Sequence, residues 1–163
     1  MAMQLVKTLQ GKKASFCIII GDMNFPELSH IKVLVVDDDP AMTDLLRLLL
    51  QPALGLVITA NSGVEGIKLV HEESPDLILL DLMMPGMDGW EVCKVVRSFS
   101  KIPIIILSAM DNPGLVASAL DAGADDYLVK PVTSSMLLAH IANIVRRMHL
   151  PSRSILSATV DKL

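Results

Sequence analysis

The chain has 163 residues, a net charge of −4 at pH 7, and 52% hydrophobic but only 3% aromatic residues. This length suits one domain with an aliphatic core and short flanking segments. The sequence has no basic block, which argues against direct nucleic-acid binding, and no apolar run long enough to span a membrane. Cys17 and Cys93 match no metal-binding or redox spacing, so we expect apolar roles for them in the reducing cytoplasm.

Three parts of the chain differ in pattern. Residues 1–30 are interpreted as an N-terminal extension of unknown role, in which the strand-like run Ala14–Ile20 has no clear partner. The extension is either a simple leader, which we favour, or an added strand or docking segment. Residues 31–149 are the regular unit, and residues 150–163 form a polar C-terminal tail or linker.

Short apolar runs alternate with amphipathic segments along the regular unit. Continuous aliphatic runs predict strands that are covered on both faces. The expected strands are Lys32–Val36, Leu56–Thr59, Leu77–Leu80, Ile104–Leu107 and Asp126–Val129. The expected helices are Ala41–Leu50, Val64–Glu73, Asp88 or Gly89 to Phe99, Leu115–Leu120 and Ser135–Met148. The inward residues expected are Met42, Leu45, Leu46 and Leu49 in the first helix, and Val92, Val95 and Val96 in the third.

The order strand then helix, repeated five times with short connections, indicates a parallel sheet with helices on both faces. Right-handed crossovers leave few topologies for such a chain. We predict an α/β fold, a flavodoxin-like doubly wound five-stranded parallel sheet with strand order 2-1-3-4-5. The switch point of that order lies between the first and third strands, so a site should form at their carboxyl ends.

Polar side chains follow four of the five expected strands directly. Asp37 and Asp38 follow the first strand, Asp81 the third, Ser108 the fourth and Lys130 the fifth. Each residue alone has an ordinary structural role, as a helix cap or a solvated charge. Because parallel strands bring their carboxyl ends to one edge, we expect these side chains to share a rim.

Carboxylates, a hydroxyl and a lysine in one place predict phosphoryl chemistry. Crowded carboxylates repel one another unless a cation joins them, and oxygen ligands with open positions suit Mg²⁺. A metal-bound carboxylate is a competent nucleophile toward phosphorus and gives an aspartyl-phosphate. Lys130 and the Ser108 hydroxyl would then neutralise the oxygens of the transferred group.

The motifs VLVVDDDP, PDLILLDLMMPGMDGWE, PIIILSA and GADDYLVKP resemble the receiver domain of bacterial response regulators over Ile31–His149. The resemblance implies a two-component signalling switch, not an enzyme with a separate substrate. Its phosphoryl group would come from a sensor histidine kinase or phosphotransfer protein. Asp81 would be the acceptor, and Mg²⁺ would be bound by Asp38, Asp81 and the backbone carbonyl of Met83, with Asp37 helping indirectly.

The resemblance also implies a switch pair, Ser108 and Tyr127, in which the hydroxyl turns toward the phosphoryl group and the ring changes its packing. Lys130 would contact the phosphoryl oxygens, and Pro131 is expected to follow it through a cis bond. The sequence departs from the family pattern at Val132, where Phe is often found. Ser at position 108, where Thr is also common, should not impair the switch.

Four charged residues are candidates for pairing two copies of the chain on phosphorylation. Asp125, Asp126, Arg146 and Arg147 resemble part of the face through which DNA-binding members dimerise at the fourth and fifth units. The helix after Asn112 lacks the basic residue that many of those members use. A solvated surface explains the four charges equally well.

Two methionines follow the candidate site residues at the same spacing. Met83 lies two residues after Asp81, and Met110 lies two residues after Ser108, so both should flank the mouth of the site. Long apolar side chains there would hinder the water that hydrolyses the acyl-phosphate. We therefore predict slow self-dephosphorylation.

Two other functions fit parts of the pattern. A phosphohydrolase of the haloacid-dehalogenase type needs Asp-x-Asp after its first strand, then a hydroxyl and a lysine, which Asp37, Asp39, Ser108 and Lys130 satisfy. That function leaves Asp81 and the Met-Pro-Gly turn behind it unexplained. A phosphorylation-independent interaction module is the third class, and the intact rim argues against it.

Overall fold

Five parallel strands form one sheet in the order β2-β1-β3-β4-β5, as predicted. The computed structural model describes residues 25–149, so the run Ala14–Ile20 and the tail 150–163 lie outside the described residues. The strands are β1 (Lys32–Val36), β2 (Leu56–Ala60), β3 (Leu77–Leu80), β4 (Ile104–Ser108) and β5 (Asp126–Val129). All side chains of β3 and β4 are buried, which explains why their sequences are aliphatic without alternation up to Ser108, the last residue of β4.

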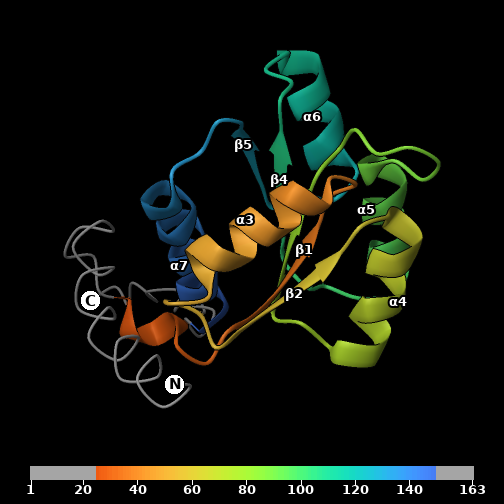
Figure 1. Ribbon diagram of the computed structural model, residues 1–163. Helices are drawn as coiled ribbons and strands as arrows, with labels where there is room; N and C mark the ends of the chain where they lie inside the picture. Colours follow the sequence, from red (N-terminus) through yellow and green to blue (C-terminus); the bar gives the residue numbers. More distant parts are fainter. Residues whose placement is uncertain (1–24, 150–163) are drawn as a thin grey trace, which may run out of the picture.

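Helices cover both faces of this sheet (Figure 1). They are η1 (Pro26–Leu28), α3 (Pro40–Leu50), α4 (Gly63–Glu73), α5 (Gly89–Phe99), α6 (Pro113–Asp121) and α7 (Ser134–His149). Helix α6 begins at Pro113, earlier than the predicted Leu115, because the Asn112 side chain accepts a hydrogen bond from the Gly114 N–H and caps the helix there. None of the helices in the described part is long and apolar enough to cross a membrane.

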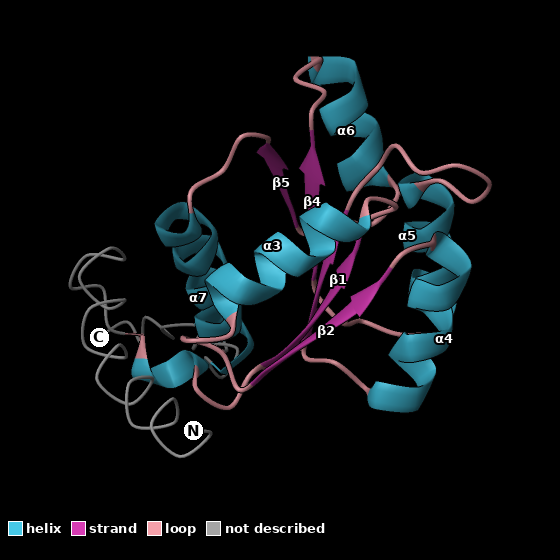
Figure 2. Cartoon of the chain, viewed as in Figure 1, coloured by secondary structure: helices cyan, strands magenta, loops and turns pink. Residues whose placement is uncertain are grey.

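Helices lie on either side of the sheet (Figure 2), and two hydrophobic layers hold them to it. One lies between the sheet and helices α3 and α7, and the other between the sheet and helices α4, α5 and α6. Leu28 of η1 is fully buried in the first layer, beside Ile31. The packed unit therefore includes residues ahead of Ile31.

The inward faces of two helices differ from those predicted. In α3 the buried residues are Thr43, Leu46 and Leu50, whereas Leu45 is 48% exposed. Thr43 can be buried because its hydroxyl donates a hydrogen bond to the Pro40 carbonyl at 3.1 Å. The prediction for Leu45 was wrong because apolar spacing alone does not reveal a satisfied polar group.

The same correction applies to α5, where Val95 was expected to face inward. Val92, Cys93 and Val96 are buried, and Val95 is exposed. Cys93 is a small apolar residue in this layer, as expected, and burial raises the pKa of its thiol to about 11.

Candidate functional site

Two buried carboxylates lie side by side at the carboxyl ends of the central strands. Asp37 is 5% exposed and Asp81 is 7% exposed. They directly follow Val36 and Leu80, which are register partners of β1 and β3. The Asp81 N–H donates to the Val36 carbonyl at 2.8 Å, which continues the ladder up to the site. Strand pairing therefore fixes the spacing of the two carboxylates.

Lys130, the residue after β5, joins these two carboxylates. Its Nζ donates to Asp37 Oδ2 at 2.7 Å and to Asp81 Oδ1 at 2.9 Å. Burial alone would lower the pKa of Lys130, but the hydrogen bonds and charges of Asp37 and Asp81 outweigh it and raise the pKa above its usual value. The side chain is therefore a positively charged ammonium between two negative charges.

Backbone amides hold the remaining carboxylate oxygens. The Met83 N–H donates to Asp81 Oδ2 at 2.8 Å, and the Asp39 N–H donates to Asp37 Oδ1 at 3.0 Å. Asp38 is exposed, and its side chain forms no hydrogen bond or ion pair with the residues that the structure describes. The site thus holds two fixed carboxylates and one without a partner beside them.

These carboxylates are the expected metal ligands, and the structure brings them together in part. Across residues 25–149 no three His, Cys, Asp or Glu side chains gather closely enough to hold a metal ion by themselves. Asp37 and Asp81 nevertheless converge on one positive charge, that of Lys130, and Asp38 lies next to Asp37 in the chain. A donor set made only of oxygens, already arranged around a cation, fits Mg²⁺ chemically.

The predicted switch residues are linked through the backbone of Met110. Ser108, at the end of β4, is fully buried, and its Oγ accepts a hydrogen bond from the Met110 N–H at 3.2 Å. The Tyr127 hydroxyl donates to the Met110 carbonyl at 2.7 Å. The backbone of Met110 therefore contacts the hydroxyl groups of both Ser108 and Tyr127.

The side chains of the two methionines expected at the mouth of the site are exposed, and their shielding of the site stays a prediction. Met83 is 56% exposed and Met110 is 38% exposed. The Lys130–Pro131 peptide bond is cis, which confirms that prediction. Val132, at the position where Phe is often found in the family, packs against the layer under α3 and α7.

Sequence reasoning missed Asn61 and Thr43, which support the loop after β1. Asn61 Nδ2 donates to the Asp37 carbonyl and to Thr43 Oγ1, both at 3.1 Å. Asn61 directly follows β2, so the strand-end rule that selected Asp37, Asp81 and Lys130 applies to it as well.

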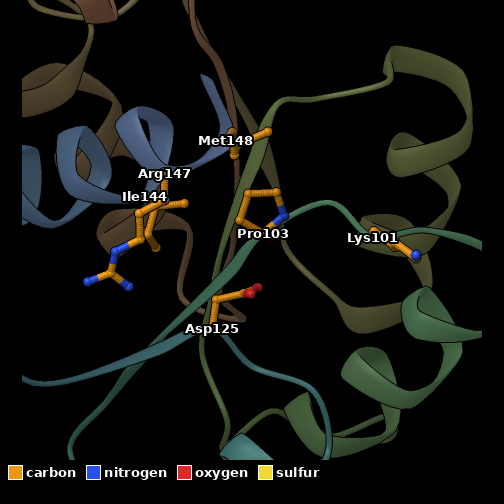
Figure 3. A pocket seen from close by; sticks show the side chains of 6 residues that line it. All are labelled: Lys101, Pro103, Asp125, Ile144, Arg147 and Met148. Carbon is orange, nitrogen blue, oxygen red and sulfur yellow. The ribbon is translucent and has the colours of Figure 1, made fainter. Parts of the chain in front are cut away.

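Three of the four charged residues expected on a pairing surface have side-chain partners among the described residues. Asp125 Oδ2 forms an ion pair with Arg97 Nη2 at 2.7 Å, and Asp126 Oδ2 lies 2.6 Å from His140 Nδ1. Arg146 donates to the side chain of Asn143, three residues earlier in α7. Arg147 and Asp125 line a cavity of about 250 Å³ together with Lys101, Pro103, Ile144 and Met148 (Figure 3). This cavity lies at the amino ends of β4 and β5, on the edge of the sheet opposite to the carboxylates.

The geometry agrees with what is found among known proteins. The family model for the response regulator receiver domain matches residues 33–142. This chain belongs to the response regulator receiver family. The receiver domain is 45% identical over 115 residues to the transcriptional regulatory protein AfsQ1 of Streptomyces coelicolor, a match that covers 71% of this chain and 51% of that protein.

Other relatives and solved structures agree. The probable transcriptional regulator ycf27 of Guillardia theta is 41% identical over 116 residues, which cover 71% of this chain and 46% of that protein. The chain therefore spans about half the length of the curated relatives it matches. The receiver domain of the Francisella response regulator 1452 has a TM-score of 0.68 and 32% identity, covering 73% of this chain and 99% of that one. A two-component response regulator from Clostridium difficile has a TM-score of 0.71 and 30% identity, covering 74% and 100%.

The phosphohydrolase alternative is not favoured, and the structure gives a physical reason. That alternative needs Asp37 and Asp39 to act together. Asp39 is instead the N-cap of α3, where its side chain accepts a hydrogen bond from the Ala41 N–H at 2.9 Å. The receiver assignment and the predicted fold are both confirmed.

Proposed function

We propose that this receiver domain accepts a phosphoryl group on Asp81 from a sensor histidine kinase or phosphotransfer protein, in a Mg²⁺-dependent reaction. The observation that carries the proposal is the shared contact of Lys130 Nζ with the buried carboxylates of Asp81 and Asp37. A partly buried ammonium that contacts a carboxylate can also contact the oxygens of a phosphoryl group that is transferred to that carboxylate.

In the proposed transfer an oxygen of Asp81 attacks the phosphorus of the donor phosphohistidine. The new O–P bond forms as the donor's N–P bond breaks, and the imidazole leaves with the electron pair. Lys130 contacts the phosphoryl oxygens, while the Met83 N–H keeps the carboxylate oriented. Asp38, Asp81 and the carbonyl of Met83 would hold Mg²⁺, with Asp37 indirect, and the bound ion supplies positive charge for the phosphoryl oxygens.

The proposed switch uses Ser108 and Tyr127. When the Ser108 hydroxyl turns toward the phosphoryl group, the Met110 N–H loses its acceptor. The Met110 carbonyl holds the Tyr127 hydroxyl, so a shift of Met110 changes the packing of the ring. A hydrogen-bonded backbone unit of this kind can carry the signal from the site to β5.

Phosphorylation-dependent pairing of two copies through α6, β5 and α7 is also part of the proposal. Asp125 and Asp126 already contact Arg97 and His140, so ion pairs across such an interface would require an exchange of partners. A cytoplasmic location, expected from the sequence, stays a prediction.

The test is the position of the phosphoryl group. The protein is incubated with acetyl phosphate and Mg²⁺, the acyl-phosphate is reduced with borohydride, and the modified aspartate is found by peptide mapping. We expect modification at Asp81 and none in Asp81→Asn. Modification at Asp37 with steady turnover would instead support the hydrolase.

A further inference from the structure

The loop between β1 and α3 is tied at both ends by one side-chain amide. Asn61 Nδ2 donates to the Asp37 carbonyl at 3.1 Å, at the start of the loop. The same nitrogen donates to Thr43 Oγ1 at 3.1 Å, and Thr43 in turn donates to the Pro40 carbonyl at the loop's end. Asn61 and Thr43 thus link the end of β2, the loop and the first turn of α3.

This arrangement fixes the peptide plane from which Asp38 projects. The carbonyl of Asp37 belongs to the peptide bond between Asp37 and Asp38, so the Asn61 hydrogen bond sets the direction of that peptide. The carboxylate of Asp38 is exposed and has no partner among the described residues, so the backbone alone positions it. Thr43 is 2% exposed, and its hydroxyl has both a donor and an acceptor role in the network.

We propose that Asn61 and Thr43 are positioning residues that hold the Asp37–Asp38 peptide ready for the divalent cation. Their hydrogen bonds act on the affinity of the empty site for the ion, before any phosphoryl donor arrives. They do not touch Asp81 or Lys130, so the rate of transfer at saturating ion should not depend on them. This inference rests on the proposed function only for the identity of the ion.

The test is the Mg²⁺ dissociation constant, measured by titration calorimetry without a phosphoryl donor. Asn61→Ala and Thr43→Val each remove two hydrogen bonds of this network and should weaken binding by about three- to tenfold. Thr43→Ser keeps the hydroxyl and should restore binding to the wild-type value. In phosphorylation assays the half-saturating Mg²⁺ concentration should rise, while the rate at saturation stays the same.

The matched control is Glu65→Ala. Glu65 Oε2 accepts a hydrogen bond from the Asn61 backbone N–H at 2.7 Å, so this variant loosens the same segment and spares the side-chain amide. We expect no change in Mg²⁺ affinity. An equal loss in Glu65→Ala, or unchanged affinity in Asn61→Ala and Thr43→Val, would overturn the proposal.

The outcomes also separate this inference from the proposed function. If the wild type binds Mg²⁺ but is not modified at Asp81, the calorimetry still tests the role of Asn61 and Thr43, and only the proposed function fails. If the wild type does not bind Mg²⁺, the inference is overturned as well.

Discussion

The two edges of the sheet both carry charged side chains but use them differently. At the amino ends of the strands, Arg97 donates to three backbone carbonyls and pairs with Asp125. Asp76 accepts a hydrogen bond from the Lys32 N–H at 2.8 Å, and Lys32 Nζ lies 3.5 Å from Glu73 Oε2. Arg97, Asp76 and Lys32 each connect one segment of the chain to another.

At the carboxyl ends, three neighbouring carboxylates are accompanied by one ammonium, which contacts two of them. Asp37 and Asp81 share Lys130, and Asp38 has no partner among residues 25–149. Excess negative charge in one place lowers the stability of the fold unless a bound cation neutralises it. Charged side chains at strand ends therefore indicate a functional site where negative charges outnumber the positive charges beside them.

The largest expected effect is that of Lys130→Gln, which removes the positive charge at the carboxyl ends. Phosphorylation by acetyl phosphate at saturating Mg²⁺ should slow by about a hundredfold, because a charge aimed at the transferred group is lost. The rate is followed by intact-protein mass spectrometry. Equal rates in the variant and the wild type would remove Lys130 from the proposed reaction.

The matched change at the amino ends is Arg97→Gln. It removes the ion pair with Asp125, which keeps only the hydrogen bond from the Ile104 N–H, and leaves several backbone carbonyls without their donor. The free energy of unfolding in urea should therefore fall by about 2 kcal/mol. The phosphorylation rate of the folded variant should equal that of the wild type. Slow phosphorylation with unchanged stability would contradict the division of roles between the edges.

The buried interior between the two edges favours uncharged groups, and the titration of the Cys93 thiol reports this preference. Its pKa is raised by burial from 9.0 to about 11, so above pH 9 unfolding releases a proton and stability falls as the pH rises toward 11. The wild type should lose about 2 kcal/mol more of its free energy of unfolding over this interval than Cys93→Ala does. Parallel curves for the two proteins would show that the thiol does not titrate as expected.

The smallest predicted effect concerns how long the phosphoryl group stays at the carboxyl ends. Met83→Asn combined with Met110→Glu should shorten the lifetime of the acyl-phosphate by about tenfold, because polar side chains can orient the attacking water. The decay is followed after removal of the phosphoryl donor. Met136→Asn, an exposed methionine on α7, is the control and should leave the lifetime unchanged. If the double variant decays no faster, the two methionines do not shield the site.

The strands were the most predictable part of the fold, because buried parallel strands are continuous aliphatic runs. Leu77–Leu80 matches β3 in both bounds. Helix faces were less predictable, as Leu45 and Thr43 demonstrate, because a buried hydroxyl depends on the carbonyl and amide that happen to meet it.

Within the candidate site, the strand-end rule selected Asp37, Asp81 and Lys130, and the structure brings these three side chains into contact. Parallel pairing alone explains that success, because it aligns the ends of neighbouring strands. The contact between Arg97 and Asp125 was not predicted. It depends on which loops meet at the amino ends, and hydrophobic periodicity does not encode this.

The central claim is that the excess negative charge at the carboxyl ends serves phosphoryl transfer to Asp81 with a divalent cation. Intact-protein mass spectrometry after incubation with acetyl phosphate tests it directly. With Mg²⁺ the wild type should gain one phosphoryl group and Asp81→Asn none, and with EDTA the wild type should gain none. An equal gain in Asp81→Asn, or an equal gain by the wild type without a divalent cation, would contradict the claim.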